Sequence, residues 1–85
     1  MKLEYAISAL REMASLEKAV SRRIMDKMQW FASQKDPLSF AKPLKNSVYG
    51  SYRFRVGDYR VFVDIKRDHI SILYVLSVKN RKDAY

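Results

Sequence analysis

The first part of the chain changes from a period of two to a helical period. Leu3 and Tyr5 alternate with polar neighbours, which predicts a short strand over Lys2–Ala6. The spacing then becomes that of amphipathic helices, and we predict two antiparallel helices over Ser8–Leu16 and Glu17–Gln34. The buried stripe of the second helix is formed by residues spaced four, four and three apart: Val20, Ile24, Met28 and Phe31.

Strand-forming residues dominate the rest of the chain. A connector over residues 36–50 holds both prolines and has no clean period, so we expect it to be ordered and extended. Three strands are predicted after it: Ser51–Val56, Asp58–Ile65 and His69–Val78. The order of elements predicts a single α+β domain over residues 1–85, with both helices on one face of a mostly antiparallel sheet.

The hairpin around Gly57 predicts an unusual grouping of charges. A two-residue type II′ turn at Gly57-Asp58 pairs Arg55 directly with Arg60. Arg53 and Phe62 share their face, because side chains alternate along a strand. Opposed like charges cost a few tenths to about 1 kcal/mol. Such a cluster favours an external anion such as phosphate, which an arginine side chain binds through two hydrogen bonds at once.

The predicted register of the last strand decides which of its side chains share the face of the arginines. We expect Ile65 to pair with Ile70. This register assigns five residues to the face covered by the helices: Ile70, Ile72, Tyr74, Leu76 and Val78. It assigns four residues to the arginine face: Ser71, Leu73, Val75 and Ser77. Lys79 and Arg81 have the same parity as the arginine face.

Composition narrows the classes of function. The net charge is +8, and the excess lies mostly after residue 41, where ten basic residues face four acidic ones, which favours a nucleic-acid partner. With no cysteine and His69 as the single histidine, we expect no disulfide, no metal and no Ser-His-Asp triad. No apolar run approaches the roughly 18 residues of a membrane span, and no secretory signal is visible. We therefore expect a cytoplasmic protein without a small-molecule cofactor.

Two stretches, "KPLKNSVYGSYRFRVGDYRVFVDI" and "ILYVLSVKNRKDAY", resemble the RelE/ParE superfamily of toxins from type II toxin–antitoxin modules. Similarity to the RelE branch implies a ribosome-dependent endoribonuclease that cuts messenger RNA in the ribosomal A site. In that reaction a 2′-hydroxyl of the RNA attacks the adjacent phosphodiester. The resemblance also implies a cognate antitoxin, with acidic and apolar residues that fit the basic sheet face and a groove beside the helices.

The resemblance assigns catalytic positions to five residues: Arg53, Arg55, Arg60, Arg81 and Tyr85. The candidate RNA contacts around them are Lys42, Lys45, Lys79 and Lys82. The arginines suit stabilisation of the charged transition state, but arginine is a poor general base because it stays protonated. Many relatives carry a histidine in the closing turn, where this chain has Asn80. The base is therefore open among Lys45, Lys79 and Tyr85, because a crowd of cations lowers the pKa of a lysine.

Two other functions fit the same superfamily. One is a ParE-like toxin that poisons DNA gyrase and has no nuclease chemistry. The other is a weak or inactive relative that serves mainly as a partner of its antitoxin. The second is motivated by Arg53 and Arg55, which stand where relatives can carry lysine, and by the missing histidine.

Overall fold

A computed structural model describes residues 1–67 and 69–84. Its elements are, in chain order, β1 (Lys2–Tyr5), α1 (Ile7–Ala14), α2 (Lys18–Ser33), the 3₁₀ helix η1 (Pro37–Phe40), β2 (Lys42–Pro43), β3 (Tyr52–Val56), β4 (Tyr59–Arg67) and β5 (Ser71–Asn80). Within the described residues the five strands form one sheet in the order β1-β5-β4-β3-β2. All neighbouring strands are antiparallel except β1, which is parallel to β5. The predicted α+β fold is confirmed.

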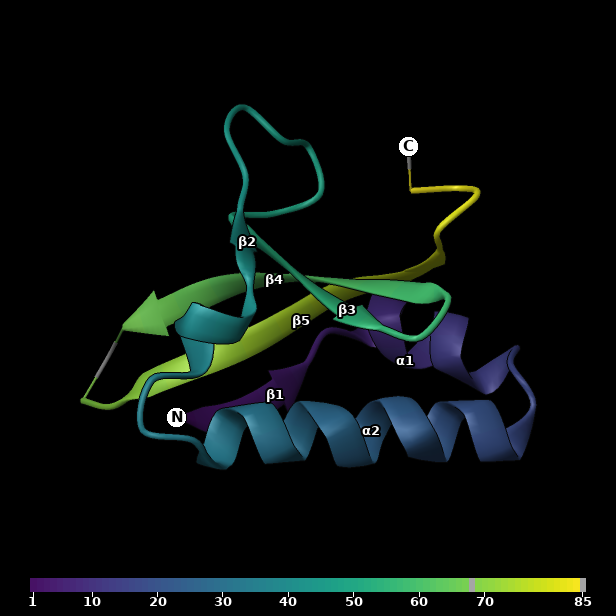
Figure 1. Ribbon diagram of the computed structural model, residues 1–85, viewed down its shortest axis with the longest axis horizontal. Coiled ribbons are helices and arrows are strands. Elements are labelled where there is room, and N and C mark those ends of the chain that lie inside the picture. The colour runs from purple at the N-terminus through teal and green to yellow at the C-terminus, as the bar shows by residue number, and fades with distance from the viewer. Residues whose placement is uncertain (68, 85) are drawn as a thin grey trace.

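The helix α2 lies against one side of the sheet, as Figure 1 shows. Its predicted stripe is confirmed, because Ile24, Met28 and Phe31 are buried in the core. The Phe31 ring contacts that of Phe54 on β3, with centroids 4.8 Å apart. The loop between β2 and β3 and the turn after β5 rise from the opposite side of the sheet (Figure 1). The face away from α2 is therefore the face on which both irregular segments stand.

The helix α1 covers an edge of the sheet that β1 leaves open. The strand β1 pairs with β5 only from Ile72 to Val75. Beyond that point the Ser8 hydroxyl donates to the Leu76 carbonyl at 2.8 Å, and Glu12 Oε1 accepts the Val78 N–H at 3.1 Å. These side chains satisfy backbone groups that an uncovered strand edge would leave without protein partners.

The connector differs from the extended segment that we predicted. Pro37–Phe40 forms a 3₁₀ turn, and only Lys42–Pro43 is extended, as the edge strand β2. Pro37 suits the first turn of a helix, because its φ is already helical and its missing N–H needs no partner there. The turn brings Phe40 against Trp30 and Phe31 of α2, with ring centroids 5.2 and 5.5 Å apart. This aromatic contact favours the compact turn over an extended chain.

The register of the first hairpin is confirmed, and that of the second is wrong. Arg55 pairs with Arg60 as predicted, but β4 continues to Arg67 and Ile65 pairs with Leu73. Leu73 and Val75 are consequently buried under the helices, whereas Ile72, Tyr74 and Leu76 are not among the core residues. Val78 returns to the core side, as predicted.

A β-bulge causes this change of side along β5. Phe62 pairs with Ser77 whereas Val63 pairs with Val75, so Leu76 is the extra residue. One inserted residue reverses the side to which the following side chains point. The sequence "ILYVLSV" is apolar at nearly every position, and alternation alone therefore could not reveal the bulge.

Candidate functional site

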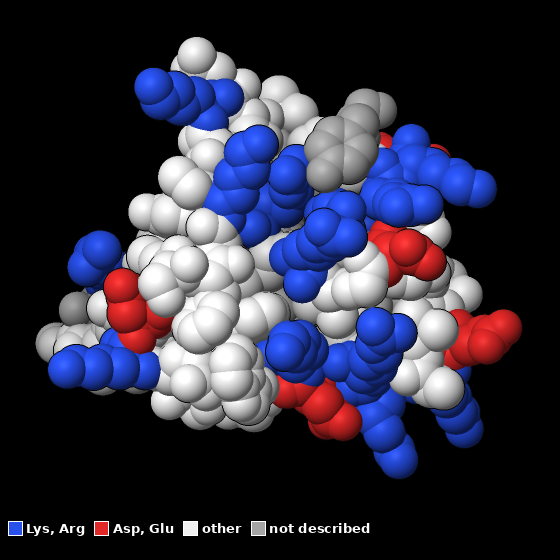
Figure 2. All heavy atoms as spheres, in the orientation of Figure 1, with Lys and Arg blue, Asp and Glu red and all other residues white. Residues whose placement is uncertain are grey.

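The strands bring the predicted arginines to one side of the sheet, which we call the cationic face. It is the side opposite α2, and its side chains are those of Arg53, Arg55, Arg60, Phe62, Ser77 and Lys79. Lys42 joins this face, because β2 pairs it with Arg53. Figure 2 shows basic side chains gathered over the middle of the molecule, with acidic side chains in smaller groups around them.

The tip of the β3–β4 hairpin is tied to the end of β5. The Arg81 backbone N–H donates to the Asp58 carbonyl at 2.8 Å, and Arg81 Nε lies 3.9 Å from Asp58 Oδ1. Asn80 shapes the closing turn, since its Oδ1 accepts the Lys82 N–H at 3.1 Å and its carbonyl accepts the Asp83 N–H at 2.8 Å. Two segments more than twenty residues apart in sequence are thus held together at one edge of the cationic face.

Arg60 is a buried residue of β4 whose side chain contacts the hairpin turn. Only 6% of the residue is exposed, and its Nη1 donates to the carbonyls of Gly57 and Tyr59 at 3.1 and 3.0 Å. Gly57 has a φ of +58°, the left-handed value that a type II′ turn needs at its first central position. These two bonds hold the guanidinium against the backbone of the turn. The turn therefore fixes a cation beside Asp58 and Arg81.

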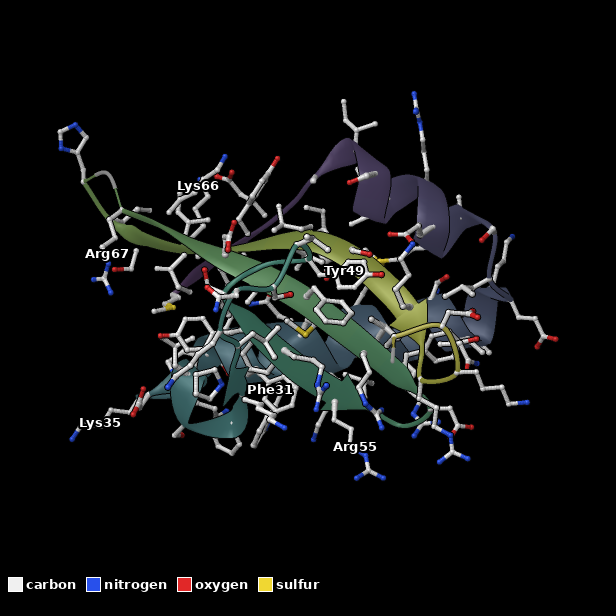
Figure 3. All side chains as sticks on the ribbon, turned by 90° about the horizontal axis from the view of Figure 1, so that it is seen from above. Phe31, Lys35, Tyr49, Arg55, Lys66 and Arg67 are labelled. Atoms are coloured by element: carbon white, nitrogen blue, oxygen red, sulfur yellow. The ribbon has the colours of Figure 1, made fainter. Side chains whose placement is uncertain are left out.

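The four predicted arginines do not all converge on one point. Arg60 and Arg81 meet at the hairpin turn. The Arg55 side chain is exposed, and Figure 3 shows it pointing outward from the sheet, away from Tyr49. Arg53 is partly buried beside β2. The hairpin turn thus has contacts with two of the four arginines.

Lys79 does not have the properties expected of a general base. Its ammonium forms an ion pair with the Glu12 carboxylate of α1. The hydrogen bond with Glu12 raises the pKa of Lys79, so the expectation of a lowered pKa is wrong. Burial acts to raise the pKa of Glu12, but hydrogen bonds from Lys79 and from the Val78 N–H together hold it below its usual value. Lys79 is therefore a fixed ammonium near the cationic face.

The other predicted lysines are solvent-facing. Lys42 lies on β2, Lys45 in the loop before β3 and Lys82 in the closing turn, and all three are exposed. Tyr85, which we predicted as a catalytic residue, lies outside the described residues. Its catalytic role stays a prediction.

Two residues near the candidates were missed by the sequence analysis. Glu12 is 67 positions before its partner Lys79, and the helical pattern gave no sign of that contact. Tyr49 lies on Phe62, with ring centroids 4.9 Å apart, and so stands over the cationic face. An aromatic residue directly before Gly50, in a loop with no other aromatic residue, was the available signal for Tyr49.

A long groove runs beside α2, on another side of the molecule. Its volume is about 1470 Å³, and it extends from α1 to the β3–β4 hairpin. The lining combines apolar groups such as Leu10 and Met25 with the cations Arg22, Lys27 and Arg55. Arg55 therefore borders both this groove and the cationic face.

The described residues offer no metal site and no membrane-spanning helix. Nowhere in residues 1–67 and 69–84 do three histidine, cysteine or acidic side chains lie close enough together to hold a metal ion. No helix in the same ranges is long and apolar enough to cross a membrane.

Known proteins share this fold. A family model described as the ParE toxin of the type II toxin–antitoxin system parDE matches residues 3–85. The crystal structure of the toxin–antitoxin complex RelBE2 from Mycobacterium tuberculosis contains a chain with 22% identity and a TM-score of 0.74, and the match covers 94% of this chain and 96% of that one.

A second similar structure is the RelB–RelE antitoxin–toxin complex from Methanococcus jannaschii. The identity is 20% and the TM-score 0.62, over 96% of this chain and 94% of that one. No curated protein sequence matches the chain. The family model spans nearly all residues, and each structural match covers more than nine tenths of the chain. The chain therefore belongs to the ParE toxin family of type II toxin–antitoxin systems, within the RelE/ParE superfamily.

Proposed function

We propose that this toxin is a RelE-like endoribonuclease that acts in the cytoplasm and cleaves messenger RNA in the ribosomal A site. The observation that carries the proposal is the hydrogen bond between the Arg81 N–H and the Asp58 carbonyl, which holds Arg81 at the turn occupied by Arg60. Two arginines from distant segments are thereby held at the same turn, on a sheet face to which Arg53 and Lys42 also belong. This arrangement suits a phosphodiester with its flanking phosphates.

The chemistry follows from what these groups can do. Attack of the 2′-hydroxyl on the adjacent phosphorus breaks the bond to the 5′-oxygen, and negative charge builds on the phosphoryl oxygens in between. Arg60 and Arg81 supply fixed positive charge for that transition state, a role in which one donor is often worth about 10²–10³ in rate. They do not accept the proton of the 2′-hydroxyl, because arginine remains protonated. Lys79 is held as an ammonium by Glu12. Lys45 and Tyr85 remain as candidate bases, and the ribosome supplies further orientation.

We further propose that a cognate antitoxin binds the groove beside α2. Both similar solved structures are toxin–antitoxin complexes, which supports a partner of this kind. The groove presents Leu10 and Met25 together with Arg22, Lys27 and Arg55. An amphipathic acidic segment complements this lining, with its apolar side on the floor and its carboxylates on the rim. Through Arg55 the same segment reaches the edge of the cationic face and blocks RNA there.

The second candidate function is inhibition of DNA gyrase by binding. It is favoured by the engagement of Lys79 with Glu12 and of Arg60 with two backbone carbonyls, since both contacts also make sense as purely structural ones. The third candidate, an inactive relative that mainly binds its antitoxin, rests on the same contacts.

The test compares Arg81→Ala with Arg67→Ala in a translation mixture programmed with one defined messenger. Arg67 is an exposed arginine on the same sheet, and Figure 3 places it far from Arg55 and Tyr49. Primer extension locates cuts, and a gyrase supercoiling assay runs in parallel. We expect ribosome-dependent cuts with the parent and Arg67→Ala, and a loss of about 10²–10³ in rate with Arg81→Ala. Intact messenger with inhibited supercoiling would assign the gyrase function instead. Inactivity in both assays would identify the antitoxin-binding relative.

A further inference from the structure

The loop between β2 and β3 carries an aromatic side chain onto the cationic face. The loop rises from the sheet on the side away from α2 (Figure 1). Its end is anchored at Ser51, whose N–H donates to the Val63 carbonyl at 3.0 Å and whose hydroxyl donates to Asp64 Oδ1 at 2.6 Å. Tyr49 stands two residues before this anchor. Its position over the sheet is therefore fixed by β4 and not by the loop alone.

The Tyr49 ring lies in the middle of the cationic face. It packs on Phe62 with centroids 4.9 Å apart and planes inclined by 37°. Phe62 lies directly opposite Arg53 on β3, and Arg60 is two residues away on β4, which is about 7 Å along a strand. Lys79 lies across from Arg60 on β5 and belongs to the same face. The aromatic ring thus lies on a face to which three strands contribute cationic residues.

The contact with Phe62 accounts for one face of the Tyr49 ring and leaves the other face without a packing role. Phe62 is 2% exposed, so its apolar surface is fully covered, and leucine or methionine would cover it as well. Tyr49 itself remains 39% exposed on the outer side of the contact. Figure 3 shows the ring lying over the sheet rather than turned down into the core. An open aromatic surface between phosphate-binding side chains is the arrangement by which proteins hold unstacked RNA bases.

We infer that Tyr49 is a base-stacking residue of the RNA site. A nucleobase of the bound RNA stacks on the outer face of the Tyr49 ring while the adjoining phosphates contact Arg53 and the exposed Arg81. This inference rests on the proposed RNA-cleaving function and adds the residue that orients the substrate. It makes Tyr49 a positioning residue, because stacking places the phosphodiester and takes no part in proton transfer.

The experiment measures stacking separately from cleavage. The probe is a single-stranded hexaribonucleotide that carries the fluorescent base 2-aminopurine at each position in turn, titrated with the toxin without ribosomes. The variants are Tyr49→Phe, Tyr49→Trp and Tyr49→Leu. All three cover Phe62 with apolar atoms, but only the first two retain a stacking surface. Urea unfolding of each variant shows that the fold is retained.

We expect the parent, Tyr49→Phe and Tyr49→Trp to bind within about threefold of one another and to quench one probe position. Tyr49→Leu should bind about 5- to 150-fold more weakly, as expected for the loss of one base–aromatic stack, and should leave that position unquenched. An oligonucleotide that is abasic at the quenched position should bind the parent and Tyr49→Leu equally.

Two results would separate this inference from the proposed function. Equal binding and quenching by the parent and Tyr49→Leu would overturn the stacking role, even if the parent cleaves messenger RNA on ribosomes. Aromatic-dependent quenching by a parent that leaves the messenger intact would overturn the nuclease proposal and retain the stacking site.

Discussion

Arg55 and Arg60 are register partners on β3 and β4, yet the side chain of one is exposed and that of the other is buried. Arg60 is buried, and its guanidinium donates to the Gly57 and Tyr59 carbonyls of the turn. Arg55 is exposed and points outward beyond the sheet (Figure 3). The cost of opposed charges is reduced because one member stabilises the turn and the other extends into solvent.

The first prediction compares Arg60→Met with Arg55→Met. Both changes remove the same like-charge pair, so the difference between them reports the other contacts of Arg60. We expect Arg60→Met to lower the free energy of unfolding by about 1–3 kcal/mol, since two turn carbonyls lose their donor. Arg55→Met should change it by about 0.5 kcal/mol or less. Urea unfolding measures both, and equal values would show that the Arg60 contacts contribute nothing.

The second prediction concerns Asp58, the acidic residue that faces Arg81. The pair is exposed and 3.9 Å long, so Asp58→Asn should leave the free energy of unfolding within about 0.5 kcal/mol. Removal of a negative charge beside the arginines should raise affinity for single-stranded RNA by up to about fivefold at low salt. Asp36→Asn, an identical charge change at the connector, should have a smaller effect. RNA binding that is the same for both variants would argue against a site at the turn.

The third prediction contrasts the two glycines. A Cβ at Gly50, where φ is +150°, would lie 2.9 Å from the Val63 carbonyl oxygen, which already accepts the Ser51 N–H. A Cβ at Gly57 would meet only the flexible end of Arg23 at 2.9 Å. We expect Gly50→Ala to cost about 2–4 kcal/mol and Gly57→Ala about 1–2 kcal/mol. Thermal unfolding ranks the two variants, and the reverse order would refute the close packing at Gly50.

The fourth prediction follows from the ion pair between Glu12 and Lys79. Glu12→Gln keeps an oxygen that can accept the Val78 N–H but removes the charge, so we expect a loss of about 1 kcal/mol at pH 7. The pKa of Glu12 is lowered in the folded protein from its ordinary value of 4.5. The contribution of the carboxylate is therefore complete above pH 4.5 and is lost as the pH falls through the lower, folded pKa.

Urea unfolding at pH 7, 5 and 3 checks this dependence. The difference between the parent and Glu12→Gln should be the same at pH 7 and 5 and should shrink at pH 3. A constant difference across all three values would assign the effect to packing rather than to charge.

The fifth prediction concerns a buried hydroxyl. Burial raises the pKa of Tyr5 to about 12, and its hydroxyl has no hydrogen-bond partner among the described residues. A buried group of this kind loses its bonds to water without replacement. Tyr5→Phe should therefore raise the free energy of unfolding by about 0.5–1 kcal/mol. Tyr74→Phe is the control, because Tyr74 is not a member of the core cluster. A destabilised Tyr5→Phe would indicate a water-mediated bond.

Local patterns in the sequence determined the elements and the first hairpin. The stripe on α2 depends on residues three and four positions apart, and the pairing of Arg55 with Arg60 depends on a turn of two residues. Residues that interact over only a few positions of sequence have few alternative partners. The helix stripe and the hairpin pairing are of this kind, and both predictions are confirmed. The grouping of cations on one face followed from the same alternation.

Contacts between distant residues decided the rest, and no local period encodes them. The bulge at Leu76 reversed the inward side of β5, because one inserted residue is enough to exchange the two faces of a strand. Lys79 is not a suitable base because its ammonium is paired with Glu12, a residue of α1 that lies 67 positions earlier in the sequence. The Asp58 carbonyl accepts the Arg81 N–H at the turn that the Arg60 side chain contacts. The ring of Tyr49 packs on Phe62. The sequence determined which charges this protein carries, and only tertiary packing decided which of them are buried, paired or open to a ligand.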